Sequence, residues 1–231
     1  MGIWIGAAAF LAVAAVMLCL RIRNVTVEGN KKYPAEQIEG MLFDNGWDRN
    51  SLVFYLQDRF RPHKQIPFVE DYEISFKDPF SVEVIIYEKS VVGYVSYMSS
   101  YMYFDKDGII VESSSSRLEG IPWVTGLTFG QIVLNQPLPV EDEQIFGQIM
   151  NLTQDLAVNA ISADQIRYDS YKNATLTIGD LEVYLGDHKE MNGKISELHD
   201  ILPELAGMAG TLYLDTYDEV SSGKWYSFIK R

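Results

Sequence analysis

The chain has 231 residues, of which 47% are hydrophobic and 22% are charged, a composition that suits one or two small domains and argues against a disordered chain. Its formal net charge of −13 argues against a broad basic surface for nucleic acid or anionic headgroups. Its one cysteine, Cys19, excludes an intrachain disulfide and a cysteine metal site.

The first twenty residues carry no charged side chain and are almost wholly apolar. At about 1.5 Å of rise per residue, one helix of this length crosses a hydrocarbon core about 30 Å thick. The alternative is a cleaved signal peptide, but nothing basic precedes the run and its apolar core is long. Leu18 also stands where a lipoprotein signal needs a small residue before Cys19. We therefore expect a retained transmembrane helix over residues 1–20.

The orientation of this segment is in conflict with simple charge counting. Arg21, Arg23, Lys31 and Lys32 all follow the apolar run, whereas only the α-amino group precedes it. Read literally, the positive-inside rule places the larger C-terminal part in the cytoplasm.

Residues 22–90 predict the order strand, helix, helix, strand, strand. The first strand, at 22–28, is rich in β-branched residues and ends at the turn pair Gly29-Asn30. A helix from Pro34 to about residue 45 follows, with Gly46 as its C-terminal stop.

The second helix of this region is expected to be capped by Ser51 and ended by Pro62. After it, residues 69–76 and 81–88 read as two strands joined by a turn at 77–80. Apolar and polar side chains alternate along the second of them, which is typical of a half-buried strand.

Residues 91–231 predict strands interleaved with two helices. Residues 101–104 and 109–111 flank a turn in which Gly108 supplies a positive φ, and the serines at 113–116 form a loop. Apolar residues recur at helical spacing over 145–156 and 191–205, and both stripes are expected to pack on a sheet. Further strands are predicted at 161–168, 174–178, 182–185, 211–217 and 225–230.

The search for chemistry in the sequence gives little. The histidines His63, His188 and His199 lack metal-ligand spacing and are expected to be solvated or to cap other groups. The acidic residues 141–143 suit a helix N-terminus better than a catalytic dyad. A phosphate-binding glycine-rich loop and a nucleophile elbow are also missing from the sequence. We predict no catalytic residue, no metal site and no cofactor.

A family resemblance is carried by the order of several short motifs. Residues 22–30, IRNVTVEGN, directly follow the apolar segment and, with the two helices and the hairpin after them, resemble a POTRA domain with its turn at Gly29 and Asn30. The pieces at 121–126, 183–186 and 210–215 are similar to the β domain of the FtsQ/DivIB family of bacterial cell-division proteins. The resemblance covers nearly the whole chain after Leu20.

The resemblance implies an α+β protein in three parts: a transmembrane helix at 1–20, a POTRA domain (β-α-α-β-β) at 21–90, and a mixed β domain with two packed helices at 91–231. It also implies a non-enzymatic, single-span scaffold of the divisome, with the N-terminus in the cytoplasm and the rest of the chain outside the cell membrane at the septum. Family members bind two small bitopic proteins, FtsL and FtsB/DivIC, and help control septal peptidoglycan synthesis.

This orientation opposes the charge count at Arg21 and Arg23. We therefore expect the natural product to carry a cytoplasmic extension rich in Lys and Arg upstream of Met1, which would restore an external C-terminal part.

Two other classes of protein are alternatives to this scaffold. A POTRA protein of outer-membrane assembly or transport would bind unfolded strands, but it is expected to have a long C-terminal run of amphipathic transmembrane strands, and the sequence reaches Arg231 without one. A membrane-anchored envelope hydrolase would need a nucleophile, a base or a metal set, which the sequence does not offer.

The partner site is predicted on the last two strands. A final strand is expected at a sheet edge, where its unpaired amides and carbonyls can accept a strand of another chain. In the family, the FtsB-type partner docks on the C-terminal edge of the β domain. The partner-binding residues expected here are Tyr217, Asp218, Trp225, Tyr226 and Phe228.

The alternative interpretation of the same strands is structural. In it, Tyr213, Trp225 and Phe228 belong to the core, and Lys230 and Arg231 protect the edge from aggregation.

Overall fold

The computed structural model describes residues 20–219 and 226–231 and divides into two compact units after Lys89. Most of the predicted transmembrane segment, residues 1–19, lies outside the described residues, as does Trp225 of the predicted partner site. No helix within the described residues is long and apolar enough to cross a membrane.

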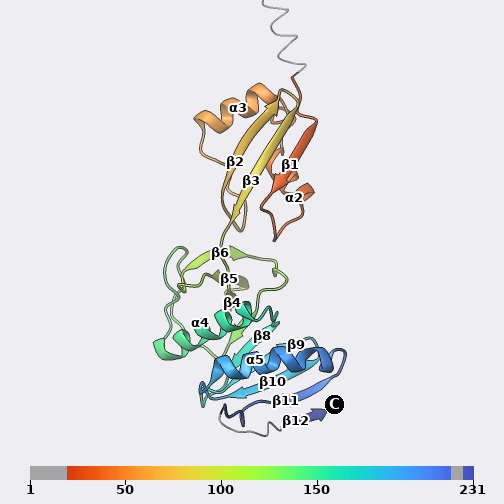
Figure 1. Cartoon of the computed structure of the whole chain (residues 1–231). Coiled ribbons are helices and arrows are strands. Elements are labelled where there is room, and N and C mark those ends of the chain that lie inside the picture. The colour runs from red at the N-terminus through yellow and green to blue at the C-terminus, as the bar shows by residue number, and fades with distance from the viewer. Residues whose placement is uncertain (1–19, 220–225) are drawn as a thin grey trace, which may run out of the picture. The chain divides into compact units, whose positions relative to one another are not determined.

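The first unit has the predicted order of elements (Figure 1). Its strands form a sheet in the order β1-β3-β2, in which β1 runs parallel to β3 and β2 antiparallel to it. The elements are β1 (Asn24–Glu28), α2 (Ala35–Leu42), α3 (Ser51–Phe60), β2 (Val69–Asp78) and β3 (Ser81–Glu88).

One face of this sheet carries the core of the first unit. Val82, Val84 and Ile86 alternate along β3 and are 1%, 0% and 3% exposed, as the period of a strand requires. Leu42 of α2 and Phe54 of α3 are buried in the same cluster. Both helices therefore cover the same face of the sheet.

The ends of the two helices differ from the prediction. Asn50, and not Ser51, caps α3, because its side-chain oxygen accepts from the amides of Leu52 and Val53, both at 3.2 Å. Ser51 is the first helical residue and its hydroxyl donates to the carbonyl of Pro79. The first helix ends at Leu42 and not near Gly46, because the Lys64 ammonium satisfies the Leu42 carbonyl at 2.7 Å.

Gly29 occupies the turn after β1 with φ of +82°. A β carbon at this position would also collide with the carbonyl oxygen of Ile86. Both the backbone conformation and the close approach favour glycine at this turn. Asn30 supports the same turn, since its side-chain amide donates to the Tyr33 carbonyl at 2.8 Å.

The second unit is built on one mixed sheet. Among the described strands the order is β12-β11-β10-β9-β8-β7-β4-β5-β6. The strands β10 and β11 are parallel and joined through α5, whereas β9 and β12 pair antiparallel to their neighbours. The elements are β4 (Gly93–Tyr97), β5 (Ser100–Phe104), β6 (Ile110–Ser114), β7 (Trp123–Thr125), α4 (Glu143–Val158), β8 (Gln165–Tyr168), β9 (Ala174–Ile178), β10 (Leu181–Gly186), α5 (Met191–Ile201), a 3₁₀ helix (Leu202–Leu205), β11 (Gly210–Tyr213) and β12 (Ser227–Lys230).

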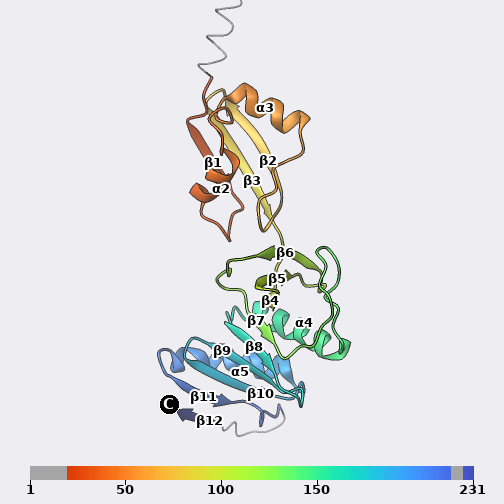
Figure 2. The same ribbon diagram turned by 180° about the vertical axis from the view of Figure 1, so that it is seen from behind.

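Both helices of this unit lie on the same side of its sheet, in front of it in Figure 1 and behind it in Figure 2. The two predicted apolar stripes face the sheet: Ile149 and Leu152 of α4, and Ile195 and Leu198 of α5, are all fully buried. Asp142 caps α4 by accepting from the Ile145 amide at 3.1 Å, which confirms the predicted role of the acidic run.

Several features of this unit were not predicted correctly. The strand β4 was missed. The strand β6 includes Ser113 and Ser114, which were assigned to a loop, and β11 ends at Tyr213 and not at Tyr217. The second apolar stripe also changes from α helix to 3₁₀ helix at Leu202, next to Pro203, whose ring cannot continue an α-helical hydrogen-bond pattern.

Candidate functional site

The strand β12 forms one edge of the larger sheet among the described strands. It pairs antiparallel with β11 in the register Thr211 to Ile229 and Leu212 to Phe228. The prediction that the last strand lies at an edge is therefore correct. This strand and the turn after β11 make up the candidate site.

The register fixes which backbone groups of β12 face outward. The amide of Arg231 donates to the carbonyl of Ala209 at 3.0 Å, so these two residues form a hydrogen-bonded pair. Hydrogen-bonded and non-bonded pairs alternate along an antiparallel ladder. Ile229 therefore directs its amide and carbonyl toward β11, while Phe228 and Lys230 direct theirs toward the open edge.

The side chains of β12 divide between the two faces of the sheet. Tyr226 and Phe228 are partly buried and pack against the core of the second unit. Ile229 points to the opposite face and is 58% exposed. Lys230 is also exposed. The core interpretation of Phe228 thus applies to its ring, whereas its backbone belongs to the edge.

The end of the strand is fixed by an ion pair that the sequence did not indicate. The Arg231 guanidinium lies 2.7 Å from the Glu182 carboxylate on β10, and so it reaches across β11. The strands β10 and β11 are separated in the sequence by α5. The ion pair between Arg231 and Glu182 could therefore be predicted only from the parallel register of these two strands.

Tyr217 lies in the turn region after β11 and packs on α5. A β carbon added at Gly193 would lie 2.6 Å from the Tyr217 ring, so the absence of a side chain at Gly193 makes room for this ring. Asp218 next to it is exposed. The structure therefore places Tyr217 and Asp218 on the α5 side of the β11 end, and Tyr226 and Phe228 on β12.

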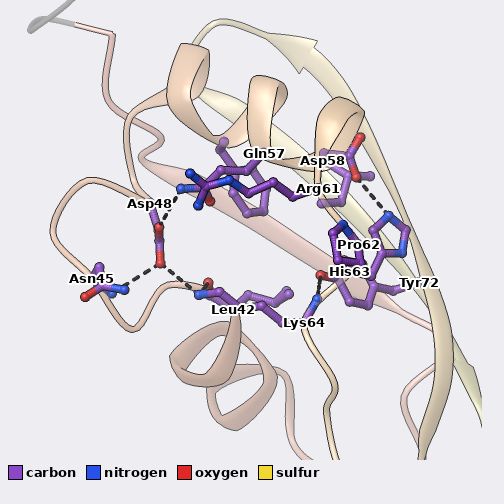
Figure 3. Close-up of a pocket in the computed structure, with 12 residues that line it drawn as sticks. Leu42, Asn45, Asp48, Gln57, Asp58, Arg61, Pro62, His63, Lys64 and Tyr72 are labelled. Carbon is purple, nitrogen blue, oxygen red and sulfur yellow. Dashed lines mark hydrogen bonds and ion pairs between the residues drawn. The ribbon is translucent and has the colours of Figure 1, made fainter.

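The first unit contains a separate pocket of about 180 Å³ between α3 and β2 (Figure 3). The Asp48 carboxylate lies 2.8 Å from the Lys64 ammonium, and Gln57 donates to it at 3.3 Å. Burial alone would raise the pKa of Asp48, but the hydrogen bonds, that from Lys64 above all, hold this pKa below its ordinary value. Burial lowers the pKa of Lys64, but its hydrogen bonds to the Asp44 and Asp48 carboxylates raise this pKa. The net result is a pKa above the ordinary value of lysine.

The other side of this pocket holds His63. Its ring nitrogens lie 3.2 Å from Asp58 on α3 and 2.7 Å from Asp71 on β2, and the ring stacks on Tyr72 with centroids 4.4 Å apart. Asp48 is thus paired with Lys64, and His63 bridges Asp58 and Asp71, an arrangement that ties α3 to β2. We interpret the pocket as a structural cross-link.

Two further polar side chains of note lie in the second unit, where His188 is half-buried and Lys194 is buried. His188 lies 2.7 Å from the Tyr168 hydroxyl, and burial, followed by the charge of Lys194, lowers the pKa of His188. Lys194 is 2% exposed and donates to the carbonyls of Leu185 and Asp187 at 2.7 and 2.9 Å. No group of three His, Cys, Asp or Glu side chains that could hold a metal ion occurs in residues 20–219 and 226–231.

The fold and the site define a two-unit α+β protein whose larger unit presents an open strand edge, an arrangement suited to an extended segment of another chain. No protein-family model matches the chain. The chain is similar to the cell division protein DivIB of Clostridium acetobutylicum, with 22% identity over 198 residues that cover 81% of this chain and 77% of the relative. This similarity supports a role in cell division.

Proposed function

We propose that the chain is a non-enzymatic scaffold of the bacterial division machinery, similar in role to FtsQ/DivIB proteins. In this proposal residues 1–20 span the cell membrane once, residues 21–90 form a POTRA domain, and residues 91–231 form the β domain outside the cytoplasm. FtsL-like and FtsB/DivIC-like bitopic proteins are the proposed partners. The similarity to DivIB over 81% of the chain supports the division role.

The observation that carries the partner proposal is the outward direction of the Phe228 and Lys230 backbone groups at the β12 edge. A partner strand that pairs with β12 would satisfy these amides and carbonyls and would extend the sheet. Ile229, exposed on one face, and the Tyr217 ring, on the other side of the sheet end, offer apolar contacts beside it.

The test measures the affinity of the full chain in lipid nanodiscs for a peptide of an FtsB/DivIC-like protein. Lys230→Pro removes the outward amide of Lys230 but leaves the β11 ladder intact, and proline is tolerated on edge strands. Lys230→Ala is the matched control, because it removes the same side chain and keeps the amide. We expect Lys230→Pro to weaken binding by tenfold or more, or about 1.4 kcal/mol, and Lys230→Ala to retain it.

The side-chain part of the site is tested separately. Tyr217→Ala and Trp225→Ala should each weaken the binding of the same peptide, while the thermal stability of the chain stays unchanged. If Lys230→Pro, Tyr217→Ala and Trp225→Ala all bind the peptide like the parent chain, the partner site does not lie at this edge. Binding lost equally in Lys230→Pro and Lys230→Ala would assign the contact to the lysine side chain and not to strand pairing.

A further inference from the structure

The start of α3 is joined directly to the residue at which the apolar N-terminal segment ends. The Ser51 amide donates to the Leu20 carbonyl at 3.0 Å, and the Ile22 amide donates to the Arg49 carbonyl at 2.7 Å. Arg21 and Asn50 form an antiparallel bridge. The helix therefore begins at the point where the chain leaves residues 1–20.

The same end of the first unit also carries the tip of the β2–β3 hairpin. The Arg23 amide donates to the Phe80 carbonyl at 2.8 Å, and the Arg23 guanidinium lies 5.4 Å from the centre of the Phe80 ring. Figures 1 and 2 show α3 lying across this end of the sheet, where β1 starts and the hairpin turns.

The outward side of α3 is apolar, which is unusual for a helix on the surface of a domain. Phe54 and Ser51 are buried beneath the helix. At about 100° per residue, the opposite side carries Leu52, Leu56 and Phe60. Leu56 is 44% exposed and Phe60 is 78% exposed. Two polar residues of α3 turn inward, since Gln57 donates to Asp48 and Asp58 pairs with His63, whereas Arg59 is exposed beside the apolar side chains.

Further apolar and basic side chains surround this helix face. Trp47, in the loop before α3, is 65% exposed, and Tyr55 is 50% exposed. Arg21 and Arg59 are exposed, and Arg21 lines a hollow together with Gly46, Trp47 and Asn50. A chain with a net charge of −13 thus places aromatic and basic side chains next to the end of its apolar segment.

We propose that the outward face of α3, formed by Leu52, Leu56 and Phe60 together with Trp47, lies in the interface of the lipid bilayer. This inference rests on the proposed function in one respect, which is that residues 1–20 span that bilayer. An amphipathic helix with an apolar face, aromatic residues and flanking arginines is the form that binds in the headgroup region. The hydrogen bond between Ser51 and Leu20 holds this face at the membrane surface.

The test uses the full chain in vesicles of phosphatidylcholine and phosphatidylglycerol. Cys19→Ser removes the only cysteine of the sequence, and a nitroxide is then attached at Leu56→Cys, Phe60→Cys or Tyr87→Cys. Tyr87 is the matched control. It is 47% exposed, but it lies on β3 roughly 20 Å from the hairpin tip, at about 3.3 Å per residue.

We expect the labels at Leu56 and Phe60 to collide with lipid-dissolved oxygen more often than with a water-soluble nickel chelate, and the label at Tyr87 to show the reverse. The preference should weaken in vesicles without phosphatidylglycerol and at high salt, because the arginines are screened. Labels at Leu56 and Phe60 that behave like Tyr87 would overturn the proposal. So would labels shielded from both reagents, which would indicate a covering protein or a second copy of the chain.

Resistance of the chain to carbonate extraction separates this proposal from the proposed membrane anchor. An extractable chain with lipid-exposed labels at Leu56 and Phe60 would refute the anchor and support the docking face. A resistant chain with water-exposed labels would support the anchor and refute the docking face.

Discussion

The carboxylate of Asp48 and the ammonium of Lys64 lie 2.8 Å apart in the first unit, and they join the loop before α3 to the segment before β2. The two side chains differ in exposure, at 4% for Asp48 and 35% for Lys64. The lysine therefore compensates a carboxylate that water cannot solvate.

Replacement of this lysine is expected to destabilise the first unit. Lys64→Met should lower the free energy of unfolding by roughly 1–3 kcal/mol, less than the loss of a fully buried pair because Lys64 is partly solvated. Lys77→Met is the control, because Lys77 pairs with Glu83 at 2.6 Å but is 58% exposed, and its loss should cost less than the loss of Lys64. Urea unfolding measures both. Equal losses of unfolding free energy in the two variants would show that burial of the ion pair does not set its contribution to stability.

The same pair predicts an acid dependence of stability. The folded pKa of Asp48 lies below its ordinary value of 3.8. Burial is the largest single influence and raises this pKa, but the hydrogen bonds together, led by the one from Lys64, outweigh it. The contribution of Asp48 to the free energy of unfolding is therefore complete above its ordinary pKa, and it is lost as the pH falls through the folded pKa. Between pH 5 and pH 2, the stability of Asp48→Asn should decline less steeply than that of the parent chain. Parallel declines in urea titrations would argue against this role.

Gly29→Val should destabilise the first unit by roughly 1–3 kcal/mol. The φ of +82° disfavours a β-branched residue, and the new side chain would collide with the Ile86 carbonyl. Gly40→Ala in α2 is the control, since its β carbon meets nothing within 4 Å and alanine favours a helix. An unchanged melting temperature for Gly29→Val would refute the turn assignment.

Much of the fold could be predicted from periodicity and turn chemistry. The alternation at Val82, Val84 and Ile86 and the helical stripe through Ile149 and Leu152 have local signals, because each element shows its own period. The strand β4 has no such signal. Its first residue, Gly93, must lack a side chain because an added β carbon would lie 2.6 Å from the Phe104 ring. That contact exists only in the folded sheet.

Gly193→Ala tests whether the Tyr217 ring is an anchor for the partner. The new β carbon would displace this ring, since it would lie 2.6 Å from its atoms, while alanine is favourable within α5. We expect the free energy of unfolding to be kept and the partner peptide to bind about tenfold more weakly. Gly147→Ala in α4, where nothing lies within 4 Å, should change neither quantity. If Gly193→Ala binds the partner peptide with unchanged affinity, the position of the Tyr217 ring does not determine that binding.

The candidate site was only partly accessible from the sequence. The edge position of the last strand was predicted, and β12 lies at an edge among the described strands. The contact between Tyr217 and Gly193 and the ion pair between Arg231 and Glu182 depend on the parallel register of β10 and β11. Register between strands separated by a helix leaves no mark in a local pattern, so these contacts could not be foreseen.

The parallel pairing of β1 with β3 determines how the first unit responds to mechanical tension. The chain enters the unit at the start of β1 and leaves it at the end of β3, and the two strands pair from Asn24 with Ser81 to Glu28 with Ile85. A force applied between Leu20 and Lys89 therefore slides the strands along each other, so that their hydrogen bonds are loaded together and not opened one after another. In the proposed function, in which the chain connects a bilayer to a division complex, such a shear geometry would transmit a pull through the unit without unravelling it.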